Sequence, residues 1–174
     1  MKLFAFFAAL CALSFAQSAS DLFKSAEELF KAGAKAYDRG DYNGSIERYS
    51  RAIETNPRYI DAYLNRAAVY YYLGDYNASV ADNSAAIEID PSNAAAYKSR
   101  GVAYYALGEY NQSIADLTKA ISIDPNFDYA YHYRALAYIE IGELEKAAKD
   151  VNTACDLDAC DLMQRLNIDG LTND

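Results

Sequence analysis

One interval organises the sequence, because the same residue types return every 34 residues. Three prolines keep this interval, Pro57, Pro91 and Pro125, and so do four glycines and four alanines: Gly40, Gly74, Gly108, Gly142, Ala52, Ala86, Ala120 and Ala154. A fixed period in this range indicates stacked supersecondary units. The chain has 174 residues, of which 52% are hydrophobic, so it is long enough for such an array with a continuous core.

Residues 94–127 show how one unit is built. Three residues at helical spacing predict the buried stripe of a first helix: Tyr97, Gly101 and Tyr104. Gly108 follows them, and its freedom to adopt positive φ suits it to end that helix. A second helical stripe runs from Tyr110 to Ile121, and Pro125 closes it because the residue before a proline is pushed out of the α region.

This unit resembles the tetratricopeptide repeat in the following residues: Tyr97, Gly101, Tyr104, Gly108, Tyr110, Ala120 and Pro125. The register recurs four times, over residues 26–59, 60–93, 94–127 and 128–161, with departures at Ala36 and Ala159. The resemblance implies an all-α fold, a right-handed α-solenoid of four helix hairpins. We expect residues 162–174 to form a capping helix and a tail, because the last unit of a repeat stack needs a cover.

The N-terminus carries one lysine and then a 14-residue apolar run from Leu3 to Ala16, followed by small residues. This pattern predicts a secretory signal peptide over residues 1–16, with cleavage after Ala16 or, alternatively, after Ser18 or Ala19. An uncleaved anchor is the other alternative, although the run is short for a bilayer span. We therefore expect a bacterial protein of the periplasmic or secreted type, with no integral membrane span in its mature chain.

Removal of the signal peptide leaves two cysteines, Cys155 and Cys160. In an oxidising compartment this pair predicts a disulfide, provided that the chain bends near Ala159. The alternative is two small buried residues. A metal site is not predicted, because the cysteines have no second pair and the only histidine, His132, is remote in the sequence.

The charge balance excludes some classes of function. The formal net charge is -9, with 25 acidic and 16 basic residues, which disfavours a nucleic-acid partner because phosphate binding needs a basic face. The sequence also lacks a nucleophile motif and a glycine-rich phosphate loop. We therefore expect neither an enzyme nor a bound cofactor.

A comparison among the repeats predicts three structural ion pairs. The second, third and fourth repeats carry Arg on the first helix and Asp on the second, whereas the first repeat has Ala32 and Arg48 at these places. Pairing within a repeat leaves no orphaned charge, so the expected pairs are Arg66 with Asp82, Arg100 with Asp116, and Arg134 with Asp150. Partly buried pairs of this kind constrain helix register more than they add net stability.

The resemblance also assigns partner contacts to a concave surface lined by the first helices. The candidate groove residues are Lys31, Tyr37, Asn65, Tyr71, Tyr72, Lys98, Tyr105, His132 and Tyr133. An aromatic lining suits an extended or helical peptide, because tyrosine gives a large contact area at little entropic cost. The alternative is that half of the tyrosines, Tyr37 and Tyr105 among them, pack between adjacent repeats. Some relatives clamp a terminal carboxylate with Lys, Asn and Arg, but only Asn65 matches that pattern.

Three N-x-S sequons occupy equivalent positions at Asn43, Asn77 and Asn111, each two residues after an acidic residue. In an exported protein they predict N-glycosylation, and the acidic residue resembles the acceptor of bacterial glycosylation systems. The alternative is duplication of one helix start, with the serine in a small buried position.

The resemblance to the tetratricopeptide repeat, together with the predicted signal peptide, implies a non-enzymatic protein–protein interaction module, a scaffold or adaptor in the bacterial periplasm. It would bind a peptide or helix of an unidentified protein in its groove and support the assembly of an envelope complex. The alternative is a self-associating structural protein, a homo-oligomer that stacks through its terminal repeat or its cap.

Overall fold

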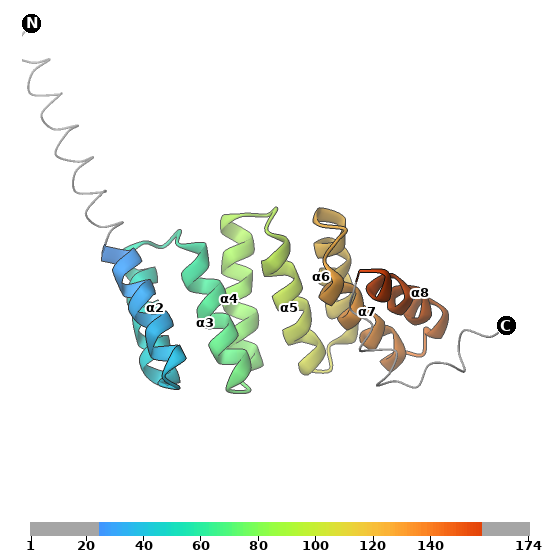
Figure 1. Cartoon of the computed structure of the whole chain (residues 1–174), viewed down its shortest axis with the longest axis horizontal. Helices are drawn as coiled ribbons and strands as arrows, with labels where there is room; N and C mark the ends of the chain where they lie inside the picture. Colours follow the sequence, from blue (N-terminus) through green and yellow to red (C-terminus); the bar gives the residue numbers. More distant parts are fainter. Residues whose placement is uncertain (1–24, 158–174) are drawn as a thin grey trace, which may run out of the picture. The chain divides into compact units, whose positions relative to one another are not determined.

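A computed structural model describes residues 25–157 of the chain, and these residues form α-helices joined by short connections (Figure 1). Residues 25–38 are helical, and the helices that follow are α2 (Tyr42–Thr55), α3 (Ile60–Tyr72), α4 (Tyr76–Ile89), α5 (Ala94–Ala106), α6 (Tyr110–Ile123), α7 (Asp128–Glu140) and α8 (Leu144–Asp156). No strand occurs between residues 25 and 157, so the predicted all-α fold is confirmed. None of the helices in this range is long and apolar enough to cross a bilayer.

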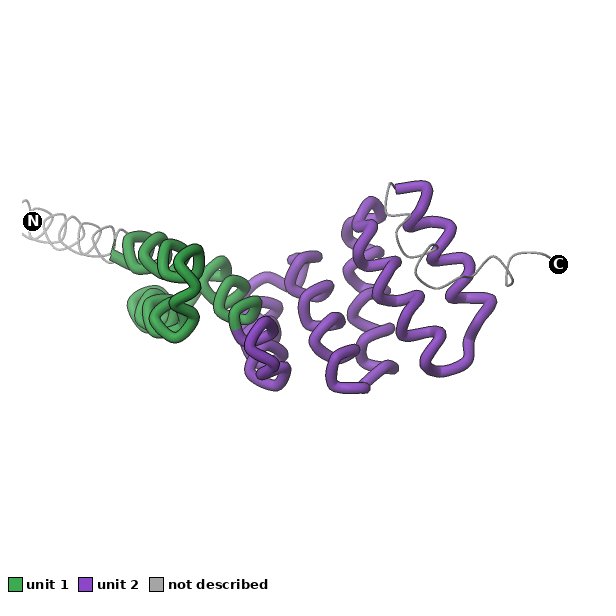
Figure 2. The backbone as a smooth tube through the Cα atoms, turned by 60° about the horizontal axis from the view of Figure 1, so that its bottom comes forward, with its two compact units in different colours: residues 1–69 green, residues 70–174 purple. Residues whose placement is uncertain are grey.

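The chain divides into two compact units, residues 1–69 and residues 70–174 (Figure 2). The second unit takes the last turn of α3 and all of α4 to α8. The predicted repeats over residues 60–93 and 94–127 each contain one helix pair. Three predicted features lie outside the described residues: the signal peptide of residues 1–16 with cleavage up to residue 19, the cap and tail of residues 162–174, and Cys160.

A glycine ends each first helix, as the sequence predicts. Gly108 has φ 78°, a left-handed backbone conformation that residues with a Cβ rarely adopt. Its N–H donates to the Tyr105 carbonyl at 2.9 Å, and the Glu109 N–H donates to the Tyr104 carbonyl at 2.9 Å. These bonds satisfy carbonyls that the end of a helix leaves without a partner, so the chain reverses without burying unpaired backbone.

Where the two helices of a repeat cross, the volumes of the two facing side chains compensate each other from one repeat to the next. In the third repeat Gly101 is buried, and a Cβ at this position would lie 2.8 Å from Cγ of Leu117. The fourth repeat has Ala135 in place of the glycine, and the smaller Val151 shares its core cluster. A larger residue on one helix is thus accompanied by a smaller one on the other, which keeps the crossing close-packed.

Small residues make up most of the core of the second unit. Helix α5 packs against α4 and α6, and α7 packs against α6 and α8. Many fully buried positions on these helices are alanines: Ala96, Ala103, Ala120, Ala130, Ala137 and Ala154. Leu117 of α6 is a large buried side chain in a core cluster with Ala120 and Ala130, and Tyr97, Phe127 and Tyr133 pack against this cluster. Because these small side chains let the helix backbones approach closely, the first helices lie near enough for tyrosines on successive first helices to contact one another.

Candidate functional site

Three tyrosines from successive first helices meet in the second unit. Tyr71 comes from the end of α3, Tyr105 from α5 and Tyr133 from α7, and all three are half-buried. The rings of Tyr105 and Tyr133 lie edge to face, with centroids 6.1 Å apart. Burial raises the pKa of Tyr71 to about 12, and the neighbouring phenol of Tyr133 contributes through its charge and a hydrogen bond. We call these three residues the tyrosine cluster.

A second set of rings supports the cluster from the second helices. Tyr71 packs on Tyr76 with centroids 5.2 Å apart, and Tyr105 packs on Tyr110 at 5.6 Å. Burial also raises the pKa of Tyr105, and the carboxylate of Glu140 adds to this shift. Rings held on both sides have little rotamer freedom left to lose when another molecule binds.

The aromatic surface continues from the cluster along α7 to solvent. The His132 ring lies 5.3 Å from that of Tyr133 and 6.4 Å from that of Tyr129. Tyr129 is 59% exposed, which makes it the outward end of this row. We call the cluster together with His132 and Tyr129 the aromatic strip. The aromatic strip thus has packed, half-buried rings at one end and the exposed ring of Tyr129 at the other.

A lysine stands on the same side of α5 as Tyr105. Lys98 precedes Tyr105 by seven residues, two helical turns, so the two side chains share one side of the helix. Its ammonium lies 5.6 Å from the centroid of the Phe127 ring. Burial lowers the pKa of Lys98, although the Asp128 carboxylate partly offsets the effect. The strip therefore has a partly desolvated cation beside it, at the start of α7.

The other predicted groove residues have separate surroundings. Lys31 pairs with Glu27 one turn away, and the Asn65 amide donates to the Asp61 carbonyl at 2.8 Å. Both lie in the first unit, as does Tyr37, which is 40% exposed and packs on Tyr42. Tyr72 is 61% exposed in the second unit. Of the predicted set, the structure thus brings Tyr71, Tyr105, His132 and Tyr133 together.

Two of these observations bear on the packing alternative. Tyr105 does pack against the next repeat, through Tyr133, whereas Tyr37 packs on Tyr42 of its own repeat. The resemblance places Tyr129 on the surface lined by the first helices, but the candidate groove residues do not include it. A signal for it existed, because Tyr129 precedes Tyr133 by four residues and so shares its side of a helix.

Family models match along much of the chain. A model described as TPR repeat matches residues 33–74 and 69–108, and two models described as tetratricopeptide repeat match residues 94–127 and 117–149. The chain carries tetratricopeptide repeats. The comparison with curated proteins finds no match.

Several solved structures have a similar fold. A crystal structure of MamA is 26% identical, with a TM-score of 0.73 over 82% of this chain and 85% of that chain. The Arabidopsis OM64 TPR domain is 27% identical, with a TM-score of 0.65 over 68% of this chain and 98% of that one. The first TPR of Spaghetti (RPAP3), bound to the HSP90 peptide SRMEEVD, is 25% identical, with a TM-score of 0.61 over 72% and 92%.

Two partly buried ion pairs join the helices within single tetratricopeptide repeats. Arg100 donates two hydrogen bonds to Asp116, at 2.6 and 2.8 Å, and Arg134 donates two to Asp150, at 2.6 and 2.7 Å. These are the partners that the sequence predicts. Arg66, in the first unit, donates to the Ser50 hydroxyl at 2.7 Å, and its predicted pairing with Asp82, which lies in the second unit, stays a prediction.

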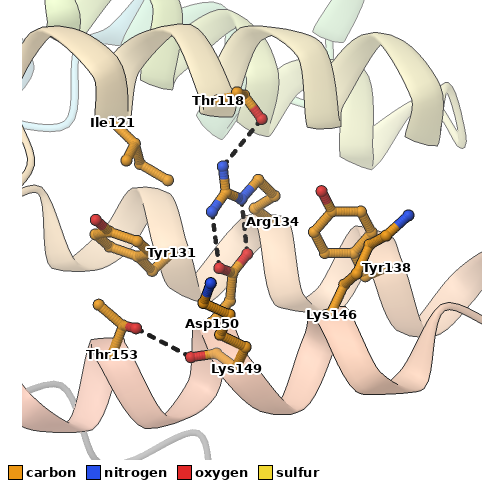
Figure 3. Close-up of a pocket in the computed structure, with 9 residues that line it drawn as sticks. All are labelled: Thr118, Ile121, Tyr131, Arg134, Tyr138, Lys146, Lys149, Asp150 and Thr153. Atoms are coloured by element: carbon orange, nitrogen blue, oxygen red, sulfur yellow. Dashed lines mark hydrogen bonds and ion pairs between the residues drawn. The ribbon is translucent and has the colours of Figure 1, made fainter.

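A pocket of about 430 Å³ lies around the Arg134 pair, between α6, α7 and α8 (Figure 3). Its lining residues are Thr118, Ile121, Tyr131, Arg134, Tyr138, Lys146, Lys149, Asp150 and Thr153. Arg134 also donates to the Thr118 hydroxyl at 3.0 Å. Arg134 and Asp150 were predicted to have a structural role only, and no pocket was predicted here.

The sequons of the tetratricopeptide repeats lie in the first turns of the second helices. Asn43, Asn77 and Asn111 are exposed, whereas the serines of the same sequons are buried: Ser45, Ser79 and Ser113. Buried serines are what duplication of a helix start would produce. Glycosylation stays a prediction.

The predicted disulfide involves the last turn of α8. Cys155 lies there, Cys160 lies outside the described residues, and their bond stays a prediction. Within residues 25–157, no group of three or more His, Cys, Asp or Glu side chains is placed to hold a metal ion.

Proposed function

We propose that this protein is a non-enzymatic interaction module that binds a peptide segment of another protein on the aromatic strip. The observation that carries the proposal is the position of Tyr129, which is 59% exposed and continuous with rings that are already packed. Exposed aromatic residues on a rigid base are typical of the few positions that dominate binding energy in protein interfaces.

The chemistry of the strip favours a peptide with apolar or aromatic side chains. Tyr133 and His132 offer ring faces and edges, and their neighbours hold them in place. Lys98 adds one partly buried cation, which favours a carbonyl or carboxylate of the bound segment close to the start of α7. The RPAP3 structure with its HSP90 peptide supports the proposal, because a peptide occupies a similar fold there.

The proposal includes export to the bacterial periplasm and a part in assembling an envelope complex. The support for export is the apolar run and the small residues of the first 16 positions. N-terminal sequencing of protein purified from the periplasmic fraction tests this part. We expect the chain to begin at Gln17 or within three residues of it, and a cytoplasmic protein that keeps residues 1–16 would contradict export.

Site-specific photocross-linking in the native cells tests the peptide-binding part. A photoreactive phenylalanine replaces Tyr129, and the matched control carries it at Asn152, which is exposed on α8. We expect Tyr129 to yield a discrete cross-linked protein that mass spectrometry identifies, and Asn152 not to yield it. The same product in equal amount from both positions would contradict binding at the strip.

A further inference from the structure

The pocket of the fourth repeat is built on a frame that the third repeat shares. Arg134 lies between two tyrosine rings, with its Cζ 5.6 Å from the centroid of Tyr131 and 5.9 Å from that of Tyr138. The third repeat has the same arrangement around Arg100, with Tyr97 at 5.7 Å and Tyr104 at 5.9 Å. A hydroxyl from the preceding repeat accepts from each arginine at 3.0 Å. The frame itself is therefore part of the scaffold.

The two repeats differ in the charge they place over this frame. Lys146 and Lys149 line the fourth-repeat pocket, whereas the equivalent residues of the third repeat, 34 positions earlier, are Gln112 and Ala115. The Lys146 ammonium lies 5.6 Å from the centroid of the Tyr138 ring (Figure 3). The fourth repeat thus carries two cations that the third repeat lacks, and the third repeat forms the same frame without them.

These cations are available to a ligand. Lys146 contacts the carboxylate of Glu143 at 3.1 Å, but both side chains are about half exposed, and such surface pairs are weak. No ion pair of the Lys149 ammonium occurs among residues 25–157. The charge of Arg134, by contrast, is already neutralised by Asp150. The residues that line the pocket thus include three cations and one carboxylate, although the chain has a formal net charge of -9.

We propose that this pocket binds a carboxylate carried on a small apolar or aromatic body. The lysines would hold the carboxylate, as Lys146 already holds that of Glu143, and Tyr131, Tyr138 and Ile121 would contact the body. A volume of about 430 Å³ is in the range of small-ligand sites. The carboxylate can belong to a free small molecule or to an acidic residue of a peptide. This site is separate from the aromatic strip and does not depend on it.

The free source is tested with benzoate and benzamide, which have the same shape but differ in charge. The full mature chain is titrated with each probe to about 10 mM while the amide resonances of α7 and α8 are followed by NMR. We expect benzoate to shift resonances around Lys146 and Lys149, and benzamide to bind about tenfold more weakly or less. Equal shifts from the two probes, or no shift from either, would rule out a free small carboxylate as the ligand.

Exchange of residues between repeats supplies matched variants. K146Q/K149A gives the fourth repeat the residues of the third, so the fold already accepts them, and benzoate binding should fall about tenfold or more. Q112K/A115K makes the reverse exchange and should create a second benzoate site near Arg100. Undiminished benzoate binding by a folded K146Q/K149A variant would refute the assignment of the site to these two lysines.

A second experiment, with peptide probes, distinguishes an acidic residue of a peptide from a free small molecule as the source of the carboxylate. The probes are acetyl-Ala-Glu-Phe-Ala-amide and its counterpart with Gln in place of Glu. Tighter binding of the Glu peptide than of benzoate identifies an acidic peptide as the ligand type, and binding of benzoate alone identifies a free small carboxylate. Equal binding of the Glu and Gln peptides together with equal binding of benzoate and benzamide would overturn the site.

Discussion

The third and fourth repeats share their interior and differ at their surface. Each has an arginine between two tyrosine rings, paired through two hydrogen bonds with an aspartate on its second helix. Over this common frame, the fourth repeat has Lys146 and Lys149 where the third has Gln112 and Ala115. The arginine–aspartate pairs join the two helices of each repeat, and the exposed substitutions place two lysines over this frame in the fourth repeat alone.

The largest expected effect concerns the shared ion pair. We expect Asp116→Ala to lower the free energy of unfolding by about 3–5 kcal/mol, because it leaves the Arg100 guanidinium, whose side chain is only 20% exposed, without its counter-charge. Asp150→Ala should have a similar effect in the fourth repeat. Urea unfolding followed by circular dichroism measures both, with exposed Lys119→Ala as the control. Losses below about 1 kcal/mol would show that the pairs are not part of the frame.

A smaller effect is expected where the two repeats differ inside. Gly101→Ala places a Cβ 2.8 Å from Cγ of Leu117, and we expect a loss of about 1–3 kcal/mol from overpacking. Adding Leu117→Val copies the Ala135–Val151 combination of the fourth repeat and should bring the free energy of unfolding back to within about 1 kcal/mol of wild type. The same urea experiment measures the rescue. A double variant no more stable than Gly101→Ala alone would show that the crossings are not equivalent.

The smallest effect concerns a phenol that the fourth repeat lacks, since Ile139 stands where the second and third repeats have Tyr71 and Tyr105. The pKa of Tyr71 is raised to about 12, so the folded chain keeps this proton at pH values where the unfolded chain, with a pKa of 10.0, loses it. Stability should therefore fall between about pH 10 and pH 12. Tyr71→Phe should make this fall shallower, as measured by urea unfolding across that range.

A control for this titration is Tyr72→Phe, which removes a phenol that is 61% exposed. This variant keeps Tyr71, so the fall in stability between about pH 10 and pH 12 should remain. Phenol absorbance followed against pH should also lose its latest-titrating component in Tyr71→Phe and keep it in Tyr72→Phe. An unchanged titration in Tyr71→Phe would refute the burial of this group in the cluster.

Much of this fold could be predicted from the sequence, because the 34-residue period repeats each local signal. Gly108 ends a helix and Pro125 follows one, as their backbone constraints require. The pairing of Arg100 with Asp116 also followed from the sequence, since a comparison among repeats reveals which charges occur together. Periodicity identified these features because they recur.

The site was harder to predict, because periodicity reveals only features that recur. Helical spacing places Tyr105 and Tyr133 on first helices, but it does not show that their rings lie 6.1 Å apart and partly bury each other. That distance depends on how closely the repeats pack, which small residues such as Ala130 determine. The pocket around Lys146 was missed because it breaks the repeat pattern, and a pattern search discounts single departures.

The affinity of the partner captured at position 129 decides whether the aromatic strip is the surface that binds it. Its affinity is measured for wild type, for Tyr129→Ala and for the control Asn152→Ala, alongside the free energy of unfolding of each. We expect Tyr129→Ala to weaken binding about thirtyfold while its stability stays within about 0.5 kcal/mol of wild type. Asn152→Ala should change neither quantity. Unchanged affinity in a folded Tyr129→Ala variant would contradict the account, because the partner would then bind elsewhere on the chain.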